Sequence, residues 1–103
     1  MKELTAKEVQ ILKVVYDAFG GACLERQLLA FSDISHDDID ELAKKNFLKR
    51  YEVEGLRFLI VRHAFYKLIG NPNRNFTLTG DNLKKSALLA EYWLSKFPTV
   101  PLH

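Results

Sequence analysis

Few residues of this 103-residue chain have types and spacings that could support catalysis or metal binding. Ser32, Asp33 and His36 offer a nucleophile, an acid and a base, but their spacing orients no base against a nucleophile. The same residues fit the end of one helix and the start of the next. His36, His63 and His103 lie far apart, without a cysteine or paired carboxylate at ligand spacing, so we expect no metal site.

A run of carboxylates and a pair of glycines are the other candidates for chemistry. The carboxylates are Asp37, Asp38, Asp40 and Glu41. A helix cannot wrap them around one cation, and the glycine that an EF-hand needs at its bend is missing. Gly20-Gly21 lacks the preceding strand and the glycine spacing of a phosphate-binding loop. We therefore expect a protein that is not an enzyme and that uses no cofactor.

Length and composition favour one domain that spans residues 1–103. With 48% hydrophobic and 27% charged residues, the chain has the composition of a globular protein. Cys23 is the single cysteine, so no intrachain disulfide is possible, and we expect it to be a small buried residue. The N-terminus lacks a signal-peptide core, and no apolar run approaches the roughly 20 residues that cross a bilayer. These features predict a cytoplasmic protein without membrane contact.

The positive charge is concentrated just after the middle of the chain, although the net charge is only +2. Residues 32–47 hold five acidic and two basic side chains, whereas residues 48–75 hold six basic and two acidic ones. A local excess of this kind is typical of a surface that binds a polyanion, but it also fits an ordinary solvated surface.

Four helices are expected, at about residues 6–18, 23–31, 36–46 and 82–97. Thr5 and Glu8 form the pattern of a capping box at the start of the first, and Gly20-Gly21 ends it. Ser35 is expected to cap the third, and Asn46 to end it in a left-handed conformation. Gly80-Asp81 is expected to cap the last helix.

The region 47–79 has strand character and is predicted to form a small β-hairpin, or wing. A hairpin is expected about Glu54-Gly55, between two segments rich in β-branched and aromatic residues. Residues 62–70 fit either a strand or a short helix, because periodicity cannot distinguish them at this length. A further short strand is expected at Phe76–Thr79. The predicted fold class is therefore mostly α with a small β-hairpin, an α+β fold.

This order of elements resembles the winged helix-turn-helix superfamily. Leu24 to Asn46 resembles the helix-turn-helix itself, and Asn46 to Arg50 the passage from a recognition helix into the wing. Arg74 to Gly80 is similar to the Leu-Thr end of the second wing strand in MarR-like regulators, where a long dimer-forming helix follows. The resemblance implies a module that binds double-stranded DNA.

Two features depart from the superfamily pattern. The stretch between Arg50 and Asn75 is longer than a simple wing needs. The expected recognition helix begins with Asp37 and Asp38, and phosphates would repel these carboxylates, although a carboxylate can accept from a cytosine amino group.

The resemblance and the basic segment together identify the candidate DNA-binding side chains. Cations near phosphates supply much of the affinity for DNA, because they release condensed counterions. The candidates are Lys44, Lys45, Lys49, Arg50, Arg57, Arg62, Lys67 and Arg74. All lie from the end of the third helix through the wing region, so we expect them to share one face.

The last helix is apolar on more than one side. One stripe consists of Leu83, Ala87, Ala90, Leu94 and Phe97, and further apolar residues beyond it are Leu88, Leu89, Tyr92 and Trp93. A helix apolar on two sides must bury both. We expect the second group, Leu88, Leu89, Tyr92 and Trp93, to form a homodimer interface, the alternative being burial within the monomer.

The hypothesis from sequence is a dimeric winged-helix DNA-binding protein. It would be a transcriptional regulator, or an accessory factor of plasmid or phage replication or partition. The alternative is a protein-interaction module on the same scaffold that does not bind DNA, with its partner on the acidic face of the third helix or on the apolar last helix.

Overall fold

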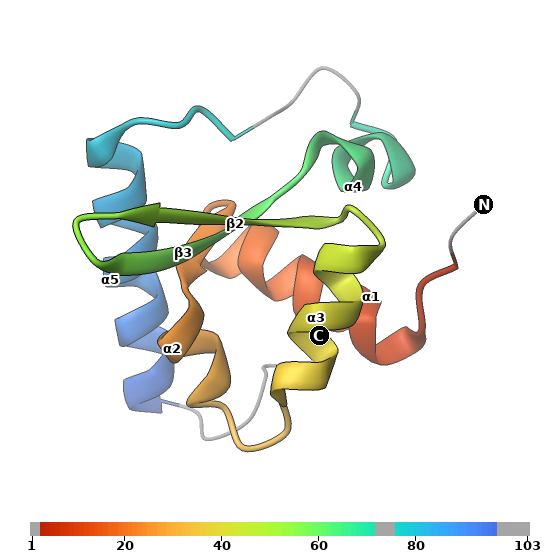
Figure 1. Ribbon diagram of the computed structural model, residues 1–103, viewed down its shortest axis with the longest axis horizontal. Helices are drawn as coiled ribbons and strands as arrows, with labels where there is room; N and C mark the ends of the chain where they lie inside the picture. The colour runs from red at the N-terminus through yellow and green to blue at the C-terminus, as the bar shows by residue number, and fades with distance from the viewer. Residues whose placement is uncertain (1–2, 72–75, 97–103) are drawn as a thin grey trace.

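The computed structural model describes residues 3–71 and 76–96, which fold into helices and one small antiparallel sheet (Figure 1). The elements are α1 (Ala6–Lys13), the π-helical turn η1 (Val14–Ala18), β1 (Ala22–Leu24), α2 (Glu25–Leu29), α3 (His36–Lys44), β2 (Leu48–Val53), β3 (Leu56–Val61), α4 (His63–Leu68) and α5 (Gly80–Lys96). This is an α+β fold, and its layout is compatible with a winged helix.

The first helical segment covers the predicted range 6–18, but its backbone hydrogen bonding changes from α-helical to π-helical at Val14. Thr5 Oγ1 accepts from the amide of Glu8, and the Glu8 carboxylate accepts from the amide of Thr5, which confirms the capping box. From Val14 onward the turn widens, and the amide of Phe19 donates to the carbonyl of Val14 at 3.2 Å. Gly20 then ends the segment at φ 81°, as predicted.

The predicted helix 23–31 is wrong in its first part, because Ala22–Leu24 is a strand. All three residues of β1 are buried, and they pair with Phe58 to Ile60 of β3. The partner strand lies more than thirty residues away along the chain, so no local pattern announces the pairing. Helix α2 begins directly afterwards, where Gln27 Oε1 accepts from the amide of Leu24 at 2.9 Å.

Helix α3 begins at the predicted residue and ends at Lys44, two residues before the predicted end. Ser35 Oγ accepts from the amide of Asp38, and the Asp38 carboxylate accepts from the amide of Ser35 at 2.9 Å. Asn46 has φ 65°, the left-handed conformation expected at the end of this helix. The chain therefore leaves α3 sharply and enters β2 at Leu48.

The sheet has the strand order β1-β3-β2, and all neighbours are antiparallel. Glu54 at φ 51° and Gly55 at φ 76° form the two-residue turn between β2 and β3, which confirms the predicted hairpin. The two positive φ angles suit the right-handed twist of the flanking strands. The wing is therefore a tight hairpin rather than a long loop.

Three expectations about residues 62–97 can be compared with the structure. The ambiguous stretch contains the short helix α4. The strand expected at Phe76–Thr79 is wrong: this segment is not hydrogen-bonded to the sheet, and it leads into α5. The cap of α5 is Thr79, whose Oγ1 accepts from the amide of Asn82 at 3.1 Å, one position before the predicted pair. Arg74 and Phe97 lie outside the described residues.

Alternate residues of the strands face two hydrophobic clusters. Cys23, Leu59 and Val61 face the main cluster, which residues of the helices on both sides of the hairpin in the chain complete. Leu24, Phe58 and Ile60 face a smaller cluster with Leu83 of α5. Figure 1 shows α5 running along one side of the sheet, away from α3. Cys23 is fully buried, as expected, and its burial raises the pKa of the thiol well above the ordinary value.

Candidate nucleic-acid interface

The eight cations predicted to bind DNA fall into different environments. Three of them, Lys45, Arg50 and Arg57, form ion pairs with carboxylates of the same chain. Lys49, Arg62 and Lys67 are exposed and form no ion pair within the described part of the chain. Lys44 makes a contact within the chain, and Arg74 lies outside the described residues. The structure therefore does not bring all eight together on one open face.

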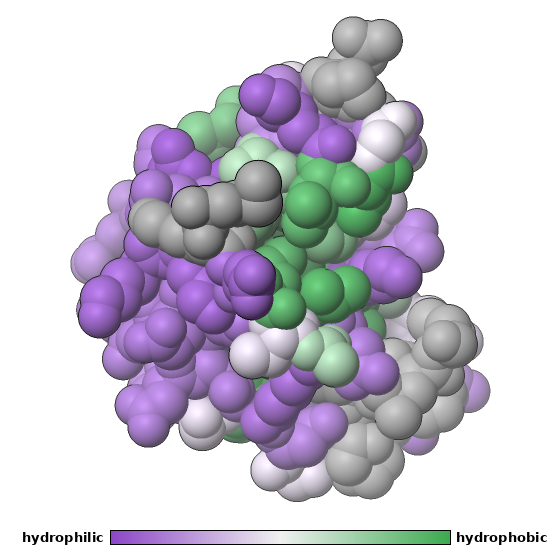
Figure 2. Space-filling model, turned by 90° about the vertical axis from the view of Figure 1, so that its right-hand side faces the viewer, coloured by the Kyte–Doolittle hydropathy of each residue, from purple (hydrophilic) through white to green (hydrophobic). Residues whose placement is uncertain are grey.

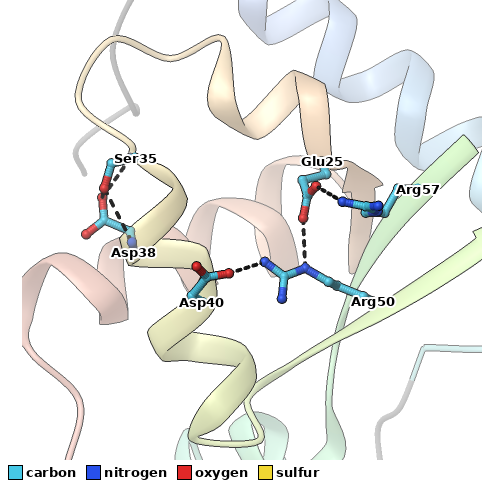
Figure 3. Close-up of polar contacts among 6 residues, drawn as sticks. All are labelled: Glu25, Ser35, Asp38, Asp40, Arg50 and Arg57. Carbon is cyan, nitrogen blue, oxygen red and sulfur yellow. Dashed lines mark hydrogen bonds and ion pairs between the residues drawn. The ribbon is translucent and has the colours of Figure 1, made fainter.

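Glu25 is the centre of the ion-pair cluster between α2, α3 and the hairpin (Figure 3). Its side chain is 9% exposed. Its Oε1 accepts from Arg50 Nε at 2.9 Å, and its Oε2 accepts from Arg57 Nη1 at 3.0 Å. Arg50 also donates from Nη2 to Asp40 Oδ1 on α3. One arginine on β2 thus connects both helices to the hairpin.

The partners in this cluster stabilise the ionised forms of Glu25 and Arg50. Burial alone would raise the pKa of Glu25, but hydrogen bonds from Arg50 and Arg57 outweigh it and hold the pKa below its ordinary value. Hydrogen bonds to Glu25 and Asp40 likewise raise the pKa of Arg50. A phosphate would have to compete with these carboxylates for Arg50, so this side chain is poorly suited to bind DNA.

Two further ion pairs join α1 to α3. Lys45 Nζ donates to Glu8 Oε1 at 2.7 Å, and Lys7 Nζ lies 2.9 Å from Asp38 Oδ2. Burial would raise the pKa of Glu8, but its bonds to Lys45 and Thr5 hold it below the ordinary value. Part of the acidic character of α3 is therefore balanced by cations from neighbouring elements.

The cations without an ion pair lie at one end of the sheet, where β2 begins and β3 ends. Lys49 stands opposite Ile60, and the amide of Arg62 donates to the carbonyl of Phe47 at 2.9 Å. Since side chains alternate along a strand, Lys49 and Arg62 are on the same face, two register positions apart. Lys67 belongs to α4, which starts directly after Arg62. We call Lys49, Arg62 and Lys67 the basic end.

The tip of the hairpin has the opposite character. Glu54 is in the turn and Glu52 lies two residues before it, whereas Arg57, which stands opposite Glu52, is paired with Glu25. The hypothesis from sequence places DNA contacts on this hairpin. Here the tip presents carboxylates, and the basic end is at the other end of the same two strands.

The surface near the N-terminus and α4 also carries apolar groups. Figure 2 shows a hydrophobic strip that interrupts the hydrophilic surface on this side of the molecule. Leu68 at the end of α4 and Ile69 directly after it are exposed, and a groove of about 550 Å³ beside α1 is lined by Val9, Val14 and Ile69. A partner on this side would meet cations and apolar side chains together.

The four residues predicted for a dimer interface do not share one environment. Leu88, Leu89 and Tyr92 are 70%, 43% and 56% exposed on α5. Trp93 is half-buried against the main cluster, and its ring lies 6.1 Å from the Tyr92 ring in an edge-to-face arrangement. The outer face of α5 therefore presents three large apolar side chains to solvent.

Sequence reasoning missed Glu25, which decides the role of two candidate arginines. Glu25 lies 25 and 32 positions from Arg50 and Arg57, so local spacing gives no sign of the pairs. In comparisons with known proteins, no family model matches the chain, and no curated protein or solved structure is significantly similar to it. In the parts of the chain that the structure describes, no helix is long and apolar enough to span a bilayer.

Proposed function

We propose that this protein is a cytoplasmic winged-helix module that binds double-stranded DNA through its basic end. The observation that carries the proposal is the position of Lys49, Arg62 and Lys67 on consecutive elements, exposed and without an ion pair in the described residues. Such cations are free to exchange counterions for phosphates. The role would be that of a regulator, or of an accessory factor in replication or partition.

The order of elements supports the winged-helix assignment. A helix, a short strand, two helices and a hairpin follow one another, and the short strand adds to the hairpin as β1-β3-β2. In Figure 1, α2 and α3 follow one another through one connection and lie below the β2–β3 hairpin, which is the order of elements in a helix-turn-helix. Helix α3 would occupy the position of the recognition helix.

The proposed mode of binding differs from the one expected from sequence. With the carboxylates of α3 and the hairpin tip exposed, deep entry of α3 into a major groove is unfavourable, because phosphates repel them. The basic end instead contacts the DNA backbone, which positions the protein without reading bases. Three phosphate contacts per protomer give a log–log salt slope of about −3, whereas eight would give about −7.

The salt dependence of binding to mixed-sequence duplex DNA tests this proposal. We expect a log–log salt slope near −3 per protomer for the native protein. The double variant Lys49→Gln, Lys67→Gln should have a slope near −1, because it lacks two of the three phosphate contacts. A matched control, Lys84→Gln with Lys96→Gln, removes the same charge from α5 and should keep most of the affinity. Absence of DNA binding at low salt, or equal losses of affinity in the two double variants, would show that the basic end is not the DNA-binding surface.

A second candidate is a protein-interaction module, which the apolar strip in Figure 2 favours. In this case the partner would contact the exposed acidic face of α3 or the apolar side chains near α4. Asp37 and Glu41 are exposed, and neither forms an ion pair in the described part of the chain, which makes them the cleaner probes of that face. Asp37→Ala with Glu41→Ala should abolish a protein complex, whereas DNA affinity should hold or rise.

A further inference from the structure

A pocket of about 340 Å³ lies between the first helical segment and α5, and none of the residues that line it belongs to the basic end. Its walls come from four parts of the chain: η1, α4, the segment before α5, and α5 itself. The residues that matter here are Tyr16, Tyr66, Phe76, Lys85, Ser86 and Leu89. The volume is at the lower end of the range that holds small organic ligands.

Tyr16 enters the pocket wall from the π-helical turn. Such turns are rare, occur mostly as single widened turns and are frequent at functional sites. The Tyr16 ring meets the Tyr66 ring edge to face, with centroids 5.2 Å apart. Asn71 Nδ2 donates to Tyr16 Oη at 3.1 Å, which fixes the ring in place. The widened turn thus contributes a positioned aromatic wall.

Two adjacent residues of α5 bring polar groups to the same pocket. Ser86 is 3% exposed, yet its hydroxyl has no hydrogen-bond partner in the residues described. No buried polar side-chain atom in these residues lacks a partner, so the Ser86 hydroxyl lies at the pocket surface, where a bound group can reach it. Lys85 is exposed and likewise forms no ion pair in that part of the chain. An ammonium and a hydroxyl together favour an acceptor-rich anionic group.

The glycine pair after η1 lets the aromatic walls come close to the backbone. A β-carbon at Gly21 would lie 2.9 Å from the Phe76 ring and 3.0 Å from Tyr66 Oη. A β-carbon at Gly20 would lie 3.4 Å from Ser86 Oγ. Besides ending the helix, the glycines therefore leave room for the rings and the hydroxyl that line the pocket.

We propose that this pocket binds a small organic anion with a flat apolar body, with its carboxylate held by Lys85 and Ser86. The aromatic side chains Tyr16 and Phe76 supply the apolar walls, and the carboxylate accepts from the ammonium and the hydroxyl. This site is separate from the basic end and does not depend on DNA binding.

Calorimetric titration of the full chain with 1-naphthoate tests the site. We expect saturable binding of one molecule per protomer, weakened about tenfold or more in Lys85→Gln, because a hydrogen bond to a charged group is lost. Ser86→Ala should weaken binding by several-fold. Lys84→Gln, one position away on α5 and outside this pocket, should bind as the native protein does.

Two further probes, one without the charge and one without the ring, test the two parts of the ligand separately. 1-Naphthamide retains the ring without the charge, and inorganic phosphate retains charge without the ring, so both should bind much more weakly than naphthoate. The proposal is overturned by absence of naphthoate binding at millimolar concentration, or by equal effects of Lys84→Gln and Lys85→Gln. Equal binding of naphthamide would also overturn it, because the carboxylate would then play no part.

Discussion

At the scale of single residues, Arg50 is the side chain whose role differs most from its expected one. It lies in the basic segment, yet it is shared between Glu25 and Asp40, on two different helices. Breaking such a pair from one side leaves the other charge without part of its hydrogen bonding. We therefore expect Arg50 to stabilise the fold.

Arg50→Gln should lower the free energy of unfolding by about 1–3 kcal/mol, because Glu25 keeps only Arg57 as a charged partner. Urea denaturation at pH 7 measures this change. The adjacent variant Lys49→Gln removes an exposed charge without an ion pair in the described residues and should change stability by less than about 0.5 kcal/mol. Similar losses in both variants would contradict a structural role for Arg50.

Acid should destabilise the protein through the same carboxylates. The pKa of Glu25 in the folded chain lies below its ordinary value of 4.5, so its stabilisation is complete above that pH and is lost as pH falls through the folded pKa. The pKa of Glu8 is also lowered in the folded chain, so its stabilisation is likewise lost as the pH falls. Unfolding free energies should be level near pH 6 to 7 and fall below about pH 4.5.

Glu25→Gln isolates the contribution of one group to this acid response. The variant should be less stable than the native protein at pH 7, but it should lose less stability between pH 5 and pH 3. A single group contributes at most about 1.4 kcal/mol per pH unit. Parallel acid profiles for the native and variant proteins would show that Glu25 is not responsible.

At the scale of elements, local signals predicted the parts whose partners are near in sequence. Thr5 with Glu8 and Ser35 with Asp38 lie three positions apart, and the turn at Glu54-Gly55 connects adjacent strands. Strand β1 was missed because Ala22–Leu24 becomes a strand only by pairing with residues of β3. Residues 76–79 have strand-like composition, but no strand of the sheet pairs with them. Hydrophobic periodicity does not reveal how distant segments pair. The Glu25 cluster, which depends on such pairing, could therefore not be predicted from the sequence.

The two-residue turn of the hairpin gives an element-scale prediction. Gly55 has φ 76°, and a β-carbon there meets no atom within 4 Å, so Gly55→Ala introduces backbone strain without a steric clash. We expect a loss of about 1–2 kcal/mol in urea denaturation. Gly80→Ala is the matched control, because Gly80 starts α5 without a positive φ and also has open space. That variant should be neutral or slightly more stable.

At the scale of the whole molecule, the basic end and the apolar face of α5 lie in different places. The basic end is at the α4 side of the sheet, and α5, with its exposed Leu88 and Tyr92, lies on the opposite side in Figure 1. A dimer formed through α5 would therefore leave both basic ends accessible. Two of them acting on one duplex would double the number of phosphate contacts per particle and so steepen its salt dependence.

We propose that two copies associate through the outer face of α5, because Leu88, Leu89 and Tyr92 form an exposed apolar group on one helix. Leu88→Lys places a charge in the centre of that face and should convert a dimer into a monomer, as measured by sedimentation equilibrium. Leu68→Lys is the control, since Leu68 is 59% exposed and lies on α4, away from α5. A native protein that is monomeric at high concentration would contradict the dimer. So would dissociation by Leu68→Lys alone, because the interface would then be the apolar strip beside α4.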